Sequence, residues 1–323
     1  MIRAFVAALV AGLVLSSTAH ALPDVTKPGR FAVGFTDLTF TKNSETTGAP
    51  RPLDTLIWYP AVAGTGTETA MGHRDATVRP GRHPLVLFSH GLCGTPQQSV
   101  FLMTALASFG FIVASPPHPG NQFTDGFPGC VANTGDSFRN RVADIRFVID
   151  SMLAESKRPG SPFLRHVNPR RIGMSGHSFG GQTTIRVALV EPRVRAALAL
   201  APAIMTVVEP GTIDIPTMIQ GAEVDSLAPF QQQSMAAFAR LVGPRFLLEI
   251  LRTGHFAFSD ICLSPGGQDC AVGTLSQDEA HMQVLRFGIP FFLRYLVGDR
   301  RFARLLTPAS VPAGVVLQAT PKR

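Results

Sequence analysis

Ser178 lies in the middle of the segment GHSFG, residues 176–180, and is the side chain best suited to act as a nucleophile. The run 171–175 (RIGMS) before it predicts a strand, and residues 180–190 after it have the pattern of a helix. A tight strand-to-helix turn raises a serine hydroxyl above the end of a strand, and flanking glycines remove the Cβ atoms that would collide there. The alternative interpretation is a glycine-rich structural turn.

A serine hydroxyl needs a base that accepts its proton and an acid that orients the base. Where the serine lies on such a turn, the acid and then the histidine follow it along the chain. Two histidines follow Ser178, and His281 lies inside the last predicted helix, where we expect a packing or surface role. His255 comes just after the last predicted strand, in a loop that can reach the serine. We therefore predict that His255 is the base.

Asp225 is the predicted acid because it follows the strand-like run 215–220 and precedes the next helical pattern. In sheets of parallel strands the chemistry lies beyond the carboxyl ends of the strands, where this position falls. Glu223 is the nearest competitor, and Asp260 is another. A turn or capping role for Asp225 is the structural alternative.

The oxyanion of a tetrahedral intermediate needs preorganised hydrogen-bond donors. We expect one donor to be the N–H of Phe179, directly after the nucleophile, at the positive end of the following helix. The second should come from the segment SHGL, residues 89–92, after an earlier strand. We assign it to the N–H of Leu92, with Gly91 permitting the turn.

Three further residues near these segments keep open roles. His90 is expected to brace its loop, and His118 either borders the site or braces a loop. Cys93 lacks the strand-turn-helix context of a nucleophile. The sequence contains no HExxH metal motif, no GxxxxGK phosphate loop and no GxGxxG, so neither a metal nor a cofactor is expected.

Apolar runs of strand type alternate with helical patterns along most of the chain, after an expected antiparallel pair at 31–40 and 53–59. This order predicts an α/β-hydrolase fold, with a mostly parallel central sheet and helices on both faces. The predicted strands are 84–89, 111–115, 171–175, 194–200, 215–220 and 246–251, and the last of these is expected to be the final strand of the chain. The predicted helices are 97–109, 136–155, 180–190, 229–241 and 278–297, the last interrupted by Pro290.

The sequence contains four cysteines, an even number that suggests disulfides in an exported protein. We expect Cys262 to pair with Cys270 across a turn-rich loop, and Cys93 to pair with Cys130. Zinc binding is the competing interpretation, but no pair has CxxC spacing and no histidine cluster accompanies the cysteines.

Residues 1–21 have the features of a secretory signal peptide. Arg3 supplies a positive charge, the apolar run 4–15 follows, and 19–21 (AHA) fits a cleavage signal. The run is shorter than the ~20 residues of a membrane-spanning helix. An uncleaved anchor or a first buried strand is the alternative. We expect a secreted or periplasmic protein whose residues 22–323 form a single catalytic domain.

The formal net charge is +7, but the basic residues are scattered, and the tightest groups are the pairs 170–171 and 300–301. No nucleic-acid motif accompanies them, so we expect a solvated surface and no nucleic-acid partner. A positive charge favours peripheral contact with anionic or lipid surfaces.

The sequence resembles the bacterial relatives of platelet-activating-factor acetylhydrolase and dienelactone hydrolase. The segments FSHGL (88–92) and GHSFGG (176–181) are similar to the oxyanion segment and the nucleophile turn of that group. His255, with Phe258 and Asp260, is similar to the segment around its catalytic histidine. Dienelactone hydrolases proper use cysteine in place of Ser178, so their lactone activity is not implied.

A second resemblance is to bacterial cutinases and polyester hydrolases. It rests on DSLAP, residues 225–229, on the late stretch 294–308, and on the order and spacing of Ser178, Asp225 and His255. This resemblance implies an ester substrate that extends to polymers.

The residues and the resemblances together predict a serine carboxylic-ester hydrolase that forms an acyl-enzyme, without a cofactor. Its expected substrates are short-acyl or lipid-like esters, as for acetylhydrolases. A cutinase-like polyester hydrolase is the first alternative. A hydrolase-fold protein that only binds apolar ligands is the second.

Overall fold

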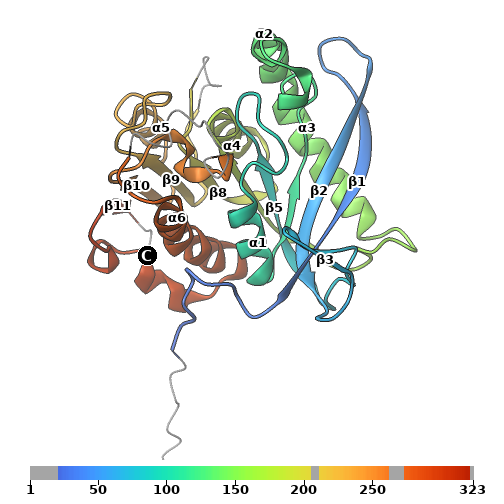
Figure 1. Ribbon diagram of the computed structural model, residues 1–323, viewed down its shortest axis with the longest axis horizontal. Coiled ribbons are helices and arrows are strands. Elements are labelled where there is room, and N and C mark those ends of the chain that lie inside the picture. The colour runs from blue at the N-terminus through green and yellow to red at the C-terminus, as the bar shows by residue number, and fades with distance from the viewer. Residues whose placement is uncertain (1–20, 205–210, 262–272, 321–323) are drawn as a thin grey trace, which may run out of the picture.

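The computed structural model describes residues 21–204, 211–261 and 273–320, and their strands form one twisted sheet (Figure 1). In this part of the chain the strand order is β11-β10-β9-β8-β7-β5-β6-β2-β1-β4-β3. The central strands β10, β9, β8, β7, β5 and β6 pair in parallel. At the flanks, β11 pairs antiparallel with β10, and β2 pairs antiparallel with β6 and β1. The strands are β1 (Ala32–Asn43), β2 (Pro50–Ala61), β3 (Thr67–Thr69), β4 (Gly72–Arg74), β5 (His83–Ser89), β6 (Ile112–Ser115), β7 (Val167–His177), β8 (Val194–Leu200), β9 (Thr217–Ala222), β10 (Arg245–Ile250) and β11 (Val315–Thr320).

Helices cover both faces of the sheet, α1 and α6 on one side and α3 and α4 on the other (Figure 1). Alternate side chains of the central strand β5 enter different cores: Val86 and Phe88 face α1 and α6, whereas Leu85 and Leu87 face α3. The predicted mostly parallel sheet with helices on both faces is therefore confirmed. The helices are α1 (Val100–Ser108), α2 (Gly129–Ala132), α3 (Thr134–Glu155), α4 (Phe179–Val190), α5 (Ser234–Phe238) and α6 (Gln277–Phe292).

Three details of the predicted elements are wrong. The strand at 246–251 is not the last one, because β11 follows it in the chain and pairs antiparallel with β10. In β11, Val315 and Leu317 are buried while Val316 is exposed, a short alternation from which no strand was predicted. The helix expected over 229–241 is shorter than predicted, because only α5, Ser234–Phe238, is α-helical there. The last helix continues through Pro290 to Phe292 and then forms a π-helical turn, Leu293–Val297.

Two predictions lie wholly or mainly outside the described residues. They are the signal peptide at 1–21, described only from residue 21, and the Cys262–Cys270 disulfide. None of the helices in the described ranges is both long and apolar enough to cross a membrane.

The turn between β7 and α4 is as tight as the sequence predicts. Ser178 is the only residue between the strand and the helix, and its φ of 59° and ψ of −120° are unusual for a side chain with a Cβ atom. A Cβ atom on Gly180 would lie 1.8 Å from the carbonyl oxygen of Ser89 at the end of β5. Only glycine therefore allows α4 to approach β5 this closely.

Replacing Gly180 with Ala should lower the free energy of unfolding on the order of 3 kcal/mol, because the backbone of β5 has no room to move aside. Gly135→Ala is the matched control, since Gly135 also lies in the first turn of a helix but faces open space. Urea unfolding followed by the fluorescence of Trp58, the single buried tryptophan, measures both variants. Equal stability of the two variants would contradict this steric explanation.

Candidate active site

The structure brings Ser178 and His255 to the wall of one pocket of about 410 Å³. Ser178 reaches it because its N–H donates to the carbonyl of Leu200 (2.9 Å) and its carbonyl accepts from Ala203 (3.0 Å). These bonds attach the turn to the end of the neighbouring strand β8. The hydroxyl of Ser178 is thereby presented beyond the carboxyl ends of the parallel strands, where the sequence analysis expected the chemistry.

His255 and Asp225 form a buried pair beside the nucleophile. Asp225 Oδ2 lies 2.7 Å from His255 Nδ1, and the other carboxylate oxygen accepts the N–H groups of Leu227 (2.9 Å) and Ala228 (2.6 Å). Both side chains are almost fully buried. The carboxylate thus makes His255 Nδ1 a donor, which leaves Nε2 as the atom that can accept a proton.

The competing residues have other partners. The carboxylate of Glu223 accepts the N–H of Arg252 (2.7 Å), and that of Asp260 accepts the N–H of Phe101 (3.3 Å) at the start of α1. His281 stacks on the ring of Phe101, with 3.6 Å between the ring centroids, which agrees with the packing role expected for it. The geometry therefore favours Asp225 and His255 over these alternatives.

The two predicted oxyanion donors lie on either side of the nucleophile. Phe179 is the first residue of α4, and Leu92 belongs to the loop after β5 that lines the pocket. Within the described residues, the N–H of Leu92 has no hydrogen-bond acceptor. The assignment of both donors remains a prediction.

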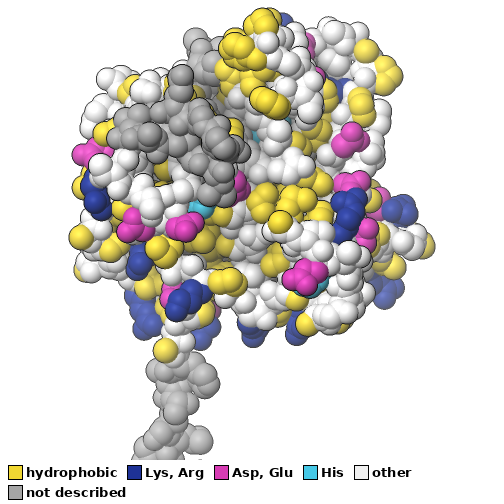
Figure 2. Space-filling model, viewed as in Figure 1, with side chains coloured by type: hydrophobic (Ala, Val, Ile, Leu, Met, Phe, Trp, Pro, Cys, Tyr) yellow, Lys and Arg dark blue, Asp and Glu magenta, His cyan; other side chains and the backbone are white. Residues whose placement is uncertain are grey.

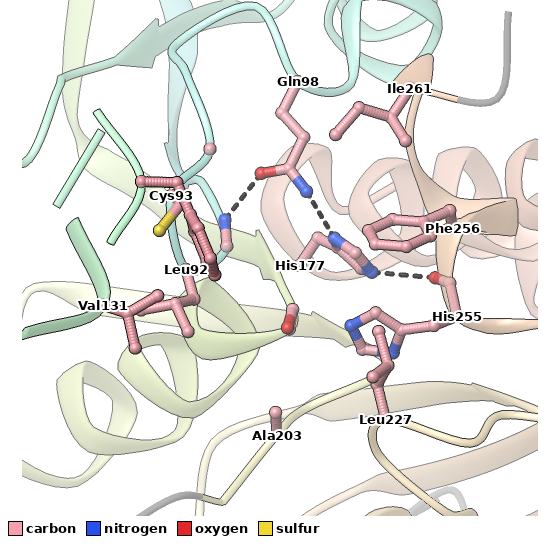
Figure 3. Close-up of a pocket in the computed structure, with 14 residues that line it drawn as sticks. Leu92, Cys93, Gln98, Val131, His177, Ala203, Leu227, His255, Phe256 and Ile261 are labelled. Atoms are coloured by element: carbon pink, nitrogen blue, oxygen red, sulfur yellow. Dashed lines mark hydrogen bonds between the residues drawn. The ribbon is translucent and has the colours of Figure 1, made fainter. Parts of the chain in front are cut away.

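Two buried polar residues that the sequence does not single out, Gln98 and His177, connect these parts. The amide of Gln98 accepts the N–H of Gly91 (2.6 Å) and donates to Nδ1 of His177 (2.6 Å), and His177 Nε2 donates to the carbonyl of His255 (2.9 Å; Figure 3). Burial and the neighbouring His255 hold the pKa of His177 well below its usual value, so the ring is neutral. One chain of hydrogen bonds thus joins the loop after β5, the nucleophile turn and the histidine loop.

The same segment also holds the backbone of the histidine loop. The carbonyl of Gln98 accepts the N–H of Asp260 (2.8 Å), and the hydroxyl of Ser99 donates to the carbonyl of Phe258 (2.8 Å). Burial raises the pKa of the Asp260 carboxyl to about 6, although the hydrogen bonds that this carboxyl accepts from the first N–H groups of α1 act to lower it. No pattern in the sequence distinguishes the buried Gln98 from its exposed neighbour Gln97.

The predicted disulfide between Cys93 and Cys130 is present. It joins the loop after β5 to α2, so Val131 and Phe127 line the pocket together with Leu92. Leu92, Cys93 and Val131 lie on one side of the pocket, and Leu227, Phe256 and His255 on the other (Figure 3). The pocket wall is therefore largely apolar on both sides of the nucleophile.

The rim of this pocket exposes apolar side chains to solvent. Phe127 is 81% exposed and Leu227 58% exposed, and Ile261 also contributes. Hydrophobic side chains gather over α2 at the top of the molecule (Figure 2). Within the described ranges, no group of three or more His, Cys, Asp and Glu side chains could hold a metal ion.

Comparison with known proteins identifies the family of this chain. The PET hydrolase-like family matches residues 131–319, a segment that contains Ser178, Asp225 and His255. The chain belongs to this family. Platelet-activating factor acetylhydrolase, isoform II, matches residues 55–123, which contain the loop after β5. Both resemblances expected from the sequence are therefore confirmed.

The individual relatives are bacterial proteins named as ester hydrolases. Lipase 1 of Moraxella sp. (strain TA144) is 27% identical over 62% of this chain and 51% of its own length. Cutinase est1 of Thermobifida alba is 26% identical over 53% of each chain. Bis(hydroxyethyl) terephthalate hydrolase of Streptomyces coelicolor is 23% identical over 80% of this chain and 72% of its own. The chain thus spans about half the length of the first two.

Among solved structures, a ferulic acid esterase from Streptomyces cinnamoneus has the same fold. Its TM-score is 0.74 at 25% sequence identity, and the match covers 91% of this chain and 98% of that one. The α/β-hydrolase fold is therefore shown by the comparison as well as by the sheet order.

Replacing Gln98 with Leu should lower the free energy of unfolding by about 2 kcal/mol, because the N–H of Gly91 and Nδ1 of His177 would lose buried partners. Gln97→Leu is the control, since Gln97 precedes it in the same segment but is exposed. The measurement is urea unfolding of both variants. If Gln98→Leu proved as stable as Gln97→Leu, the bridge would contribute nothing to folding.

Replacing Asp260 with Asn should stabilise the protein in a pH-dependent way. The folded-state pKa of about 6 lies above the ordinary aspartate value, so ionisation costs stability as pH rises through about 4 to 6. Asn removes this cost and still accepts hydrogen bonds. We expect little gain at pH 4 and about 2–3 kcal/mol at pH 8 by urea unfolding. The exposed Asp54→Asn is the control, and a gain that is the same at both pH values would contradict the assignment.

Proposed function

We propose that this protein is a serine carboxylic-ester hydrolase in which Ser178, His255 and Asp225 form the catalytic triad. The observation that carries the proposal is the buried Asp225–His255 pair at 2.7 Å, whose histidine lines the same pocket as the strained Ser178. A structural glycine turn would need neither the acid nor the base. Membership of the PET hydrolase-like family supports the same conclusion.

In the proposed mechanism, Nε2 of His255 takes the proton from the hydroxyl of Ser178 as its oxygen attacks the ester carbonyl. Asp225 keeps Nδ1 protonated and stabilises the imidazolium that forms. The N–H groups of Leu92 and Phe179 donate to the oxyanion. His255 then protonates the leaving alcohol, and water, activated by the same nitrogen, releases the acyl group from Ser178.

We propose short-acyl or lipid-like esters as the first substrate class. The acetylhydrolase match covers the loop that carries Leu92, and the pocket offers apolar walls on both sides of Ser178. Peripheral contact with a lipid surface would bring the exposed Phe127 and Leu227 at the rim against apolar material. Export to the periplasm or medium, as residues 1–21 predict, is part of this proposal.

A polyester is the second candidate substrate, and a different observation favours it. The PET hydrolase-like family match spans the whole triad, and the relatives include a cutinase and a bis(hydroxyethyl) terephthalate hydrolase. An exposed apolar rim also suits a flat, insoluble substrate. Soluble products released from a polyester film would favour this candidate, and good activity on small esters without such release would exclude it.

Replacing Ser178 with Ala should reduce kcat on p-nitrophenyl esters, from acetate to palmitate, on the order of 10⁴-fold or more, because the nucleophile is lost. Ser175→Ala is the matched control: Ser175 is buried on β7, the strand that precedes Ser178, and its hydroxyl has no partner among the described residues. Chain-length preference separates a small acyl pocket from an open groove. Undiminished hydrolysis by Ser178→Ala, or failure of a fluorophosphonate probe to label the wild type, would overturn the proposed mechanism.

A further inference from the structure

A fully buried guanidinium lies directly beneath the loop that carries Leu92. Arg141 is on α3, its exposed fraction is zero, and all five of its N–H groups have acceptors. The acceptors are neutral oxygens: Ser137 Oγ (2.9 Å), Ser89 Oγ (3.0 Å), Asn121 Oδ1 (2.7 Å) and the backbone carbonyls of His90 (2.5 Å) and Gly91 (3.1 Å).

The two carbonyl contacts determine how the loop presents its N–H groups. A trans peptide is planar, and its C=O and N–H point in opposite directions. The carbonyl of His90 is held by Arg141, so the N–H of Gly91 at the other end of that peptide points to Gln98, which accepts it. In the next peptide Arg141 and Nδ1 of His90 both hold the carbonyl of Gly91. The N–H of Leu92 must therefore point away from the guanidinium.

The same guanidinium contacts the side chain of Phe179, the residue whose N–H is the other predicted donor. Its central carbon lies 4.4 Å from the centroid of the Phe179 ring, a cation–π distance. One side chain thus contacts the backbone of the loop that carries Leu92 and the ring of the residue that follows Ser178. A planar fork with five donors can do this, whereas a lysine ammonium cannot bond to so many oxygens in one plane.

A buried polar network keeps the guanidinium in place and charged. Ser89 donates to His118 Nε2 (2.9 Å), and His118 Nδ1 donates to Asp144 (3.0 Å), which pairs with Arg51 (2.9 Å). Burial and the nearby Arg141 hold the pKa of His118 well below its usual value, so its ring is neutral. Burial lowers the pKa of Arg141 to about 9, which leaves the guanidinium protonated at neutral pH.

We propose that Arg141 is a positioning residue for the oxyanion hole, which orients the N–H of Leu92 through the loop carbonyls and supports the start of α4 through the ring of Phe179. The inference rests on the proposed esterase function. Burying a cation is costly, and an apolar side chain would fill the same space without that cost. The carbonyl contacts explain what the cation does there.

The experiment compares Arg141→Lys and Arg141→Met with the wild type on a p-nitrophenyl ester and its thionoester, in which sulfur replaces the carbonyl oxygen. Rigid donors placed for oxygen reject the larger sulfur, a weaker acceptor. We expect kcat on the ester to fall on the order of 10–100-fold in both variants, with little change in KM. The ratio of ester to thionoester kcat should fall on the order of tenfold, a change that a loss of stability alone would not produce.

Arg139→Met is the control, because Arg139 is an exposed arginine on the same helix and should leave the ratio unchanged. If the Arg141 variants fail to fold, Asn121→Ala keeps the guanidinium but removes one of its anchors, and the ratio should fall by about threefold. An unchanged ratio in folded variants would overturn the proposal. A wild type that hydrolyses no ester would instead refute the proposed function.

Discussion

The backbone of α4 approaches the end of β5 more closely than any side chain would permit, and the rest of the site depends on this approach. A Cβ atom at Gly180 would overlap the carbonyl of Ser89. Because the helix lies against that strand end, Ser178 and the loop after β5 border the same pocket. Parallel pairing of β5, β7, β8, β9 and β10 then brings Asp225 and His255 to the same edge of the sheet.

Buried polar side chains hold the loops around this edge in one arrangement. The amide of Gln98 joins the loop after β5 to His177, which in turn bonds to the histidine loop, and Arg141 uses every donor of its guanidinium. A buried polar group that loses a partner is costly, so such networks resist alternative loop conformations. The Cys93–Cys130 disulfide adds a covalent link between the same loop and α2. The pocket is consequently lined by segments that are far apart in the sequence.

The apolar rim of the pocket connects the fold to the two candidate substrates. Phe127 comes from the segment before α2, and Leu227 from the turn after Asp225. Both substrate candidates present apolar surface next to an ester carbonyl, so the rim suits either. Apolar side chains lie on both sides of Ser178 along the pocket wall.

The sequence by itself determined the sheet with its helices and the residues of the proposed triad, because these depend on local patterns. The linear sequence contains the strand periodicity, the glycines around Ser178 and the order of Asp225 and His255 along the chain. Only the tertiary structure decided which polar residues are buried together. Gln97 and Gln98 are adjacent residues of the same type, yet only Gln98 is buried, where its amide forms a hydrogen bond to His177. Hydrogen bonds between distant segments leave no periodic signal, so the supports of the site, unlike its reacting groups, appear only in the folded chain.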